Sequence, residues 1–148
     1  MAEAKFLIEP AQPADRAAVL DLLGHCGLPT DGLADHWAAV LVARDGEQVA
    51  GCAGLELYGQ YALLRSVAVA PAYRGCGLGR QLTGQALQMA RGRGVRQVYL
   101  LTETAADYFP RFGFQPVDRT AVPEAVRQSV EFTSACPQSA QAMALVLV

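Results

Sequence analysis

Hydrophobic residues recur along this chain with two periods, and each period predicts a different element. Apolar residues at steps of three and four predict an amphipathic helix over residues 78–91, and the same spacing marks residues 15–23. Shorter helices are expected over residues 31–37, 105–112 and 123–133. Apolar runs bounded by turn residues predict strands over residues 5–9, 38–43, 48–57, 62–70, 95–102, 115–119 and 143–148.

The order of these elements predicts a mixed sheet. Asp45-Gly46 is a hairpin signal between the second and third strands, and residues 58–61 make the next turn, so three strands form an antiparallel meander. The fourth strand, the long helix and the fifth strand then form a crossover, which places strands 62–70 and 95–102 parallel. We therefore expect an α/β fold in which helices flank a mixed antiparallel and parallel sheet.

The loop after the fourth strand carries the clearest chemical signal. It begins at Pro71, has glycine at positions 75, 77 and 79, and leads into a helix that starts near Leu78. Glycine lets the backbone approach a ligand and adopt dihedrals that a Cβ blocks. The start of a helix leaves N–H groups without partners and is electropositive. Together these features predict a pocket for phosphate or pyrophosphate.

Two other phosphate motifs do not fit this loop. A Walker loop needs Gly-Lys-Ser/Thr at the helix start, but Gly79 is followed by Arg80 and Gln81. A dinucleotide fingerprint needs Gly-x-Gly-x-x-Gly, whereas the glycines here alternate strictly. An ordinary glycine-rich turn remains the alternative.

The loop resembles the pyrophosphate signature Arg/Gln-x-x-Gly-x-Gly/Ala of the GNAT acetyltransferases, with the match Arg74-Gly75-Cys76-Gly77-Leu78-Gly79. The resemblance implies acetyl-CoA as cosubstrate, no metal, and a sheet splayed between its fourth and fifth strands. It also implies that a main-chain N–H of the fourth strand binds the acetyl carbonyl. The cofactor-binding residues implied in this way are Val67, Ala68, Val69, Arg74, Gly75, Cys76, Gly77, Leu78, Gly79, Arg80 and Thr102.

Two positions depart from the family pattern. The segment ending in Gly113-Phe114 resembles the family's Phe-Tyr-x-x-x-Gly-Phe, but Phe109 occupies the position of the tyrosine that often protonates the coenzyme A thiolate. Tyr108 lies one residue earlier, about 100° around a helix, and is the remaining candidate for a catalytic tyrosine. Thr102 replaces an asparagine often found near the end of the preceding strand.

Acetyl transfer to an amine needs a base, a donor for the oxyanion and a proton for the thiolate. Glu56 is the candidate base, and Glu103 is the alternative. Arg65 and Ser66 are candidates for acceptor binding, although only one of them can face the cleft from a regular strand unless a bulge intervenes. A buried Arg65 needs an acidic partner or an anionic ligand, so both a structural salt bridge and a carboxylate clamp stay open.

The resemblance also implies an entrance made of a strand, a helix, a loop and a second helix, of which the loop and the second helix help to form the acceptor side of the cleft. Candidate acceptor contacts there are Glu9, His25, Asp35, His36 and Trp37, each of which is also compatible with a surface or core role.

A narrower resemblance, to the ArsN-type acetyltransferases of arsenic-resistance operons, rests on the central strands and the tail. The matching segments are Leu64-Arg65-Ser66-Val67-Ala68-Val69, Tyr99-Leu100-Leu101-Thr102, Val122-Pro123-Glu124-Ala125, Ser129-x-Glu131-Phe132 and Cys136-Pro137-x-Ser139-Ala140. It implies an acceptor that is a small amino-acid-like amine, including arsenic- or phosphorus-containing toxins.

Composition bounds the remaining possibilities. The 148 residues suit a single domain over residues 1–148, and a formal net charge of -2 without a basic run gives no support for a nucleic-acid partner. No apolar stretch is long enough to span a membrane, and residues 1–5 lack a signal-peptide pattern, so we expect a cytoplasmic protein. The four cysteines form no Cys-x-x-Cys pair, which disfavours a zinc site.

Two functions from other classes stay open. Phe109 in place of a tyrosine is compatible with a cofactor-binding sensor that has lost catalysis. A trivalent-arsenic-binding module would require the thiolates of Cys26, Cys52 and Cys136 to converge. Protein acetylation and a homodimer also remain compatible with the sequence.

Overall fold

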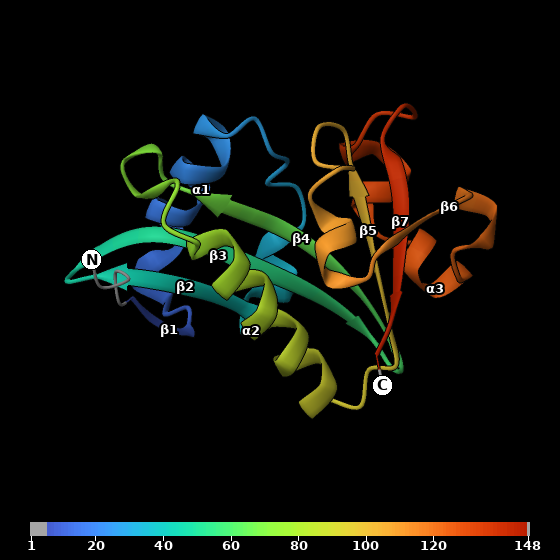
Figure 1. The fold of residues 1–148 in the computed structure, drawn as a ribbon, viewed down its shortest axis with the longest axis horizontal. Coiled ribbons are helices and arrows are strands. Elements are labelled where there is room, and N and C mark those ends of the chain that lie inside the picture. Colours follow the sequence, from blue (N-terminus) through green and yellow to red (C-terminus); the bar gives the residue numbers. More distant parts are fainter. Residues whose placement is uncertain (1–5, 148) are drawn as a thin grey trace.

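A seven-stranded mixed sheet organises the computed structural model, which describes residues 6–147 (Figure 1). The strand order is β1-β2-β3-β4-β5-β7-β6, and among these described strands only β4 and β5 pair in parallel. The strands are β1 (Leu7–Pro10), β2 (Val40–Asp45), β3 (Gln48–Tyr58), β4 (Tyr61–Val69), β5 (Gln97–Thr102), β6 (Gln115–Val117) and β7 (Gln141–Val146). The mixed α/β sheet expected from the sequence is confirmed. Residues 1–5 and 148, which include two expected strand ends, lie outside the described part of the chain.

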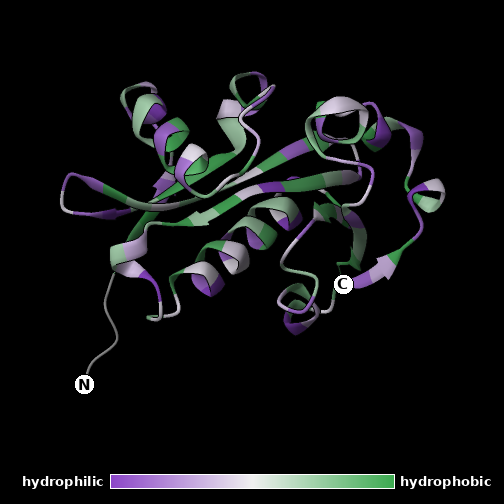
Figure 2. Cartoon of the chain, turned by 90° about the horizontal axis from the view of Figure 1, so that it is seen from above, coloured by the Kyte–Doolittle hydropathy of each residue, from purple (hydrophilic) through white to green (hydrophobic). Residues whose placement is uncertain are grey.

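Helices cover both faces of the sheet, as Figure 2 shows from above. Strand β2 alternates between the two faces: Leu41 and Ala43 pack with helix α2 (Leu78–Gly92), whereas Val40 and Val42 pack with α1 (Arg16–His25). The apolar stripe expected for the long helix is confirmed, because Leu82, Ala86 and Ala90 of α2 are fully buried. A third apolar cluster joins β4, β5 and β7 to α3 (Glu124–Arg127).

Several short helices are tighter or shorter than the sequence predicts. Two of the expected helices are 3₁₀ segments: η2 (Leu33–Ala39) replaces the helix expected over residues 31–37, and η4 (Phe109–Phe112) the one expected over residues 105–112. The first strand is longer than expected at its end, because Pro10 belongs to the edge strand β1. The helix expected over 123–133 divides into α3 and the π-turn η6 (Glu131–Ala135). At the break, the Ser129 hydroxyl accepts a hydrogen bond from the Glu131 N–H at 3.2 Å, which competes with the helical ladder.

The pairing of β4 with β5 ends early. The paired residues are Tyr61 with Gln97, Ala62 with Val98, and Leu63 with Tyr99; beyond them the strands diverge toward their carboxyl ends (Figure 1). Strand β5 continues along β7 as far as Thr102, and β4 continues along β3 as far as Val69. The splay between the fourth and fifth strands is therefore confirmed, and it opens the sheet at the ends where the glycine loop begins.

Strand β4 also carries a bulge. Gly54 pairs with Arg65 and Cys52 with Ala68, so Ser66 and Val67 together lie opposite Ala53. Ser66 adopts φ 60°, a left-handed conformation uncommon for a residue with a Cβ. The bulge breaks strict alternation along β4, and both Arg65 and Ser66 can therefore reach the open side of the strand.

The packing of α2 on the sheet predicts a large stability effect at Leu82. Replacing this fully buried residue by alanine should lower the free energy of unfolding by about 2–5 kcal/mol, because it leaves a cavity under the sheet. The matched control is Leu20→Ala in α1, where the residue is 37% exposed and the change should stay within about 0.5 kcal/mol. Urea denaturation of both variants measures the difference, and equal losses would contradict the packing described here.

Candidate active site

The loop between β4 and α2 is shaped for an anion. Gly75 and Gly77 adopt φ values of +84° and +82°, which residues with a Cβ rarely take, and Gly77 is the N-cap of α2. Within the described part of the chain, no side chain caps α2 and its first turn holds no acidic residue. The N–H groups of that turn therefore lack a side-chain acceptor and make this end of the helix electropositive.

A cavity of about 1050 Å³, the loop cavity, lies against this turn. Tyr108 and Arg111 face the loop across it, and a Cβ built on Gly79 would lie 3.3 Å from the Tyr108 hydroxyl oxygen. The loop cavity is lined by ten of the residues expected from the sequence to bind the cofactor: Val67, Ala68, Val69, Arg74, Gly75, Cys76, Gly77, Leu78, Gly79 and Arg80.

A second cavity of about 330 Å³, the cleft cavity, fills the opening between β4 and β5. It shares Arg74 and residues 67–69 with the loop cavity, so the two spaces adjoin along the end of β4. Thr102, the eleventh residue expected to bind the cofactor, lines it, as do Arg65, Ser66, Glu103 and Glu131. A long ligand bound at the glycine loop can thus extend along β4 into a small chamber with polar walls.

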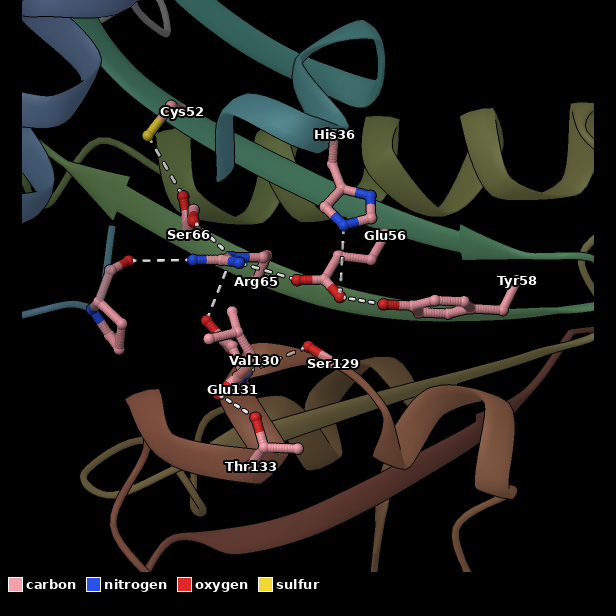
Figure 3. Close-up of polar contacts among 11 residues, drawn as sticks. His36, Cys52, Glu56, Tyr58, Arg65, Ser66, Ser129, Val130, Glu131 and Thr133 are labelled. Carbon is pink, nitrogen blue, oxygen red and sulfur yellow. Dashed lines mark hydrogen bonds and ion pairs between the residues drawn. The ribbon is translucent and has the colours of Figure 1, made fainter. Parts of the chain in front are cut away.

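Arg65 is enclosed by oxygen atoms at the base of the cleft cavity (Figure 3). Its Nη1 lies 2.8 Å from Glu56 Oε2 and its Nε lies 3.2 Å from Glu131 Oε2. Its Nη2 donates to the Pro29 carbonyl at 3.3 Å, and its side chain is 0% exposed. Arg65 therefore forms a buried salt bridge to two carboxylates, one of the two roles left open by the sequence.

The two carboxylates differ in their protonation. Burial acts to raise the pKa of Glu56, but hydrogen bonds with Tyr58, Ser129 and Arg65 and the nearby His36 outweigh it, so the pKa lies below its ordinary value. Burial raises the pKa of Glu131 to about 7, and Arg65 offsets this effect only in part. At neutral pH, Glu56 is charged, whereas Glu131 is poised to gain or lose a proton.

Glu56 itself does not line either cavity, although it was expected to act as a base. It is 1% exposed and lies behind Arg65, where it accepts a hydrogen bond from Tyr58. Glu103, the alternative, lines the cleft cavity. Glu131 was not among the site residues expected from the sequence. Its segment, Ser129-x-Glu131-Phe132, is one of those that resemble the ArsN-type enzymes, and this resemblance was the signal that could have indicated it.

The residues expected at the acceptor entrance are dispersed. None of Glu9, His25, Asp35, His36 and Trp37 lines either cavity. Glu9 accepts a hydrogen bond from Arg44, and His25 is exposed with its Nδ1 3.0 Å from the Asp21 carbonyl. His36 lies nearest the site, with its Nε2 3.7 Å from Glu56 Oε1.

The aromatic pair near the end of β5 divides between the two cavities. Phe109 is buried and lines the cleft cavity, whereas Tyr108 lines the loop cavity. The Thr102 hydroxyl accepts a hydrogen bond from the Ala105 N–H at 2.9 Å and so fixes the turn that leads to them. The tyrosine hydroxyl is therefore directed to the glycine loop.

The cysteines are engaged separately. The Cys76 thiol donates to the Tyr73 carbonyl at 2.8 Å and the Cys52 thiol to the Ser66 carbonyl at 3.2 Å. Burial raises the pKa of both Cys52 and Cys136 to about 12. Among residues 6–147, no three His, Cys, Asp or Glu side chains are arranged to hold a metal ion, and no helix has the length and apolarity of a membrane span.

Comparison with known proteins identifies the family. Residues 36–116, more than half of the chain, match the acetyltransferase (GNAT) domain family. The chain is 27% identical over 134 residues to an uncharacterized N-acetyltransferase of Chlorobaculum tepidum, covering 85% of this chain and 86% of that protein. It is 38% identical over 77 residues to an amino-acid acetyltransferase of Mycobacterium tuberculosis, covering 51% of this chain but only 43% of the relative.

Solved structures show the same fold. A Mycobacterium tuberculosis protein in complex with CoA and NLQ superposes with a TM-score of 0.82 at 25% identity, over 96% of this chain and 99% of that chain. The N-acetylglutamate synthase of Neisseria gonorrhoeae, complexed with coenzyme A and N-acetyl-glutamate, gives a TM-score of 0.84 at 21% identity, over 99% of this chain and 36% of that chain. At that identity the second likeness concerns the fold alone.

The splayed sheet, the glycine loop and the family match agree on one class of protein. The chain belongs to the GNAT family of acetyltransferases. The resemblance seen in the sequence is thereby confirmed at the level of the family, while the narrower likeness to ArsN-type enzymes stays a prediction.

The loop geometry predicts that Gly77→Ala weakens acetyl-CoA binding. A Cβ at φ +82° strains the N-cap and shifts the N–H groups of the first turn of α2, so the dissociation constant should rise about tenfold or more, about 1.4 kcal/mol. The matched control is Gly84→Ala within α2, where an added Cβ meets nothing within 4 Å and affinity should not change. Calorimetric titration measures both, and unaltered binding by Gly77→Ala would show that the pyrophosphate lies elsewhere.

Proposed function

We propose that this protein transfers the acetyl group of acetyl-CoA to the amine of a small amino-acid-like acceptor. The observation that carries the proposal is the junction of the two cavities along the end of β4. The glycine loop offers N–H donors for the pyrophosphate, and the splay admits the pantetheine arm from there to the cleft cavity. The thioester then meets the acceptor beside the bulge of β4, where a main-chain N–H between Val67 and Val69 polarises its carbonyl.

The size and charge of the cleft cavity favour a small amine. Its volume of about 330 Å³ suits an amino acid better than a peptide chain. Glu103 and Glu131 are acidic walls that attract an ammonium group, and Ser66 is a neutral hydrogen-bonding partner. Amino-acid acetyltransferases among the relatives support this choice of acceptor, although the chain spans only 19% of the length of the one from Aeromonas salmonicida.

The other predicted site residues take secondary roles in this proposal. Arg65 positions the carboxylates, because its donors are directed to Glu56, Glu131 and Pro29. Tyr108 contacts the cofactor from across the loop cavity. His25 lies outside both cavities and reaches an acceptor only if part of it extends past the cleft.

An arsenic- or phosphorus-containing acceptor is the finer form of the proposal. It rests on the likeness of the tail and central strands to ArsN-type enzymes, and it would give the protein a role in resistance in the cytoplasm. An arsinate or phosphinate tail can accept hydrogen bonds in the cleft cavity as a carboxylate does. A homodimer remains compatible with this reaction.

A cofactor-binding sensor is the second candidate function. Phe109 lies buried in the wall of the cleft cavity, where the family often has the tyrosine that protonates the thiolate. A sensor would bind acetyl-CoA through the glycine loop without turnover. Direct measurement of turnover separates the two functions.

The proposed reaction predicts release of coenzyme A thiol that depends on an acceptor amine. Acetyl-CoA is incubated with the protein and a panel of amino acids that includes glutamate and its phosphinate and arsinate analogues. At least one acceptor should give release above hydrolysis, and the same compound with its amine already acetylated should give none. Tight acetyl-CoA binding without turnover would favour the sensor, and no binding would contradict both functions.

A further inference from the structure

Glu131 is a buried carboxylate that faces the cleft cavity from the π-turn η6, a segment outside the family's cofactor motif. It is 4% exposed, and Figure 3 shows Glu131 approaching Arg65 from the C-terminal segment, whereas Glu56 approaches it from the sheet. The π-turn itself depends on Ser129, whose hydroxyl holds the Glu131 N–H. The C-terminal part of the chain thus delivers one acidic side chain to the wall of the cleft.

We propose that Glu131 removes the proton from the acceptor amine, and that Arg65 and Glu56 are positioning residues for it. The inference rests on the acetyl transfer proposed above. Of the carboxylates considered as bases, Glu56 is separated from the cleft cavity by Arg65, whereas Glu131 lines the cavity directly. Glu103 also lines it and is the competing base.

The charges around Glu131 explain why it is the member of the cluster that exchanges protons. One guanidinium, Arg65, serves two carboxylates, and Glu56 has further donors in Tyr58 and Ser129. Four titratable groups surround Glu131. Arg65 and Glu56 belong to the sheet, Cys136 follows η6 in the chain, and Asp31 lies in the loop before η2. Burial and the negative charges of Glu56 and Asp31 oppose its ionisation, and Arg65 and Cys136 favour it.

The bulge in β4 gives Arg65 its position. Ser66, at φ 60°, lets Arg65 turn toward the open side, where its Nε lies 3.3 Å from the Ser66 hydroxyl and 3.2 Å from Glu131 Oε2. Arg65 holds Glu131 at the cavity wall without neutralising it fully, because it is shared with Glu56. A base with a pKa near the working pH transfers protons efficiently in both directions.

The step conserves protons and electrons. The acceptor enters as an ammonium ion and gives one proton to the Glu131 carboxylate. The freed nitrogen lone pair forms the C–N bond with the acetyl carbon, the C–S bond breaks, and its electron pair leaves with the sulfur. The second nitrogen proton passes to the thiolate, which yields free coenzyme A, and Glu131 returns its own proton to solvent.

The test is the pH dependence of kcat/KM for the acceptor, measured together with kcat at saturating acetyl-CoA, from about pH 5.5 to about 8.5. The carboxylate must be deprotonated to act, so kcat/KM of the unsubstituted protein should rise with pH through an inflection near 7 and then level off. Glu131→Gln should lower the plateau about 100-fold or more and abolish the inflection. Glu131→Asp should keep the inflection at a reduced kcat.

Two comparisons separate chemistry from structure. Glu124→Gln, an exposed change in α3, should leave kcat and its profile unchanged. Glu103→Gln should retain the inflection, even if its kcat is lower. If Glu103→Gln loses the inflection and Glu131→Gln keeps it, the base is Glu103 and the inference is overturned. The acetyl-CoA dissociation constant of Glu131→Gln should equal that of the unsubstituted protein, which shows that the fold and the loop cavity are intact.

The remaining outcomes are also decisive. If Glu131→Gln keeps both kcat and the inflection, Glu131 is not the base, but the proposed acetyl transfer is unaffected. No thiol release by the unsubstituted protein with any acceptor would overturn both. If substitutions at Glu131 prevent folding, the unsubstituted protein still decides, since a profile without an inflection between about pH 6 and 8 contradicts the inference.

Discussion

The early end of pairing between β4 and β5 is the constraint on which the site depends. After three paired positions the strands separate, and each keeps its other neighbour, so the sheet stays intact while its middle opens. Backbone N–H and C=O groups on the open sides lose strand partners and need others. A ligand with a chain of amide groups, such as the pantetheine arm of coenzyme A, can supply them. The glycine loop begins where β4 ends, so the proposed phosphate site and the cleft cavity share one strand.

The buried group of Glu56, Arg65 and Glu131 is the second organising feature. Removing charges from water is costly, and such a group is tolerated when each charge has close partners. Here two carboxylates share one guanidinium, so the group of three side chains has a net charge of about -1 when both carboxylates are ionised. Glu56 keeps its charge because it has more donors. Burial and the unfavourable negative charge therefore raise the pKa of Glu131, which faces the cavity where the proposed reaction takes up a proton.

Much of the fold could be predicted from the sequence because the deciding signals are local. The stripe of α2, the Asp45-Gly46 turn and the alternating glycines of residues 75–79 each act within a few residues, and the parallel pair follows from their order. The bulge at Ser66 could not be predicted, because it depends on register between two strands. Glu131 reaches the cleft only through a π-turn and a contact with a strand more than sixty residues earlier, which no periodicity encodes. The entrance residues, which the family resemblance suggested as acceptor contacts, likewise proved to lie outside both cavities.

A crystal structure of the protein bound to coenzyme A would show directly whether the splay and the glycine loop hold the cofactor. We expect pyrophosphate oxygens about 3 Å from the main-chain nitrogens at the start of α2, with the pantetheine arm between β4 and β5. We also expect the thiol to end beside residues 67–69, at the junction of the loop and cleft cavities. Coenzyme A bound elsewhere, or a splay filled by side chains in the complex, would contradict this placement.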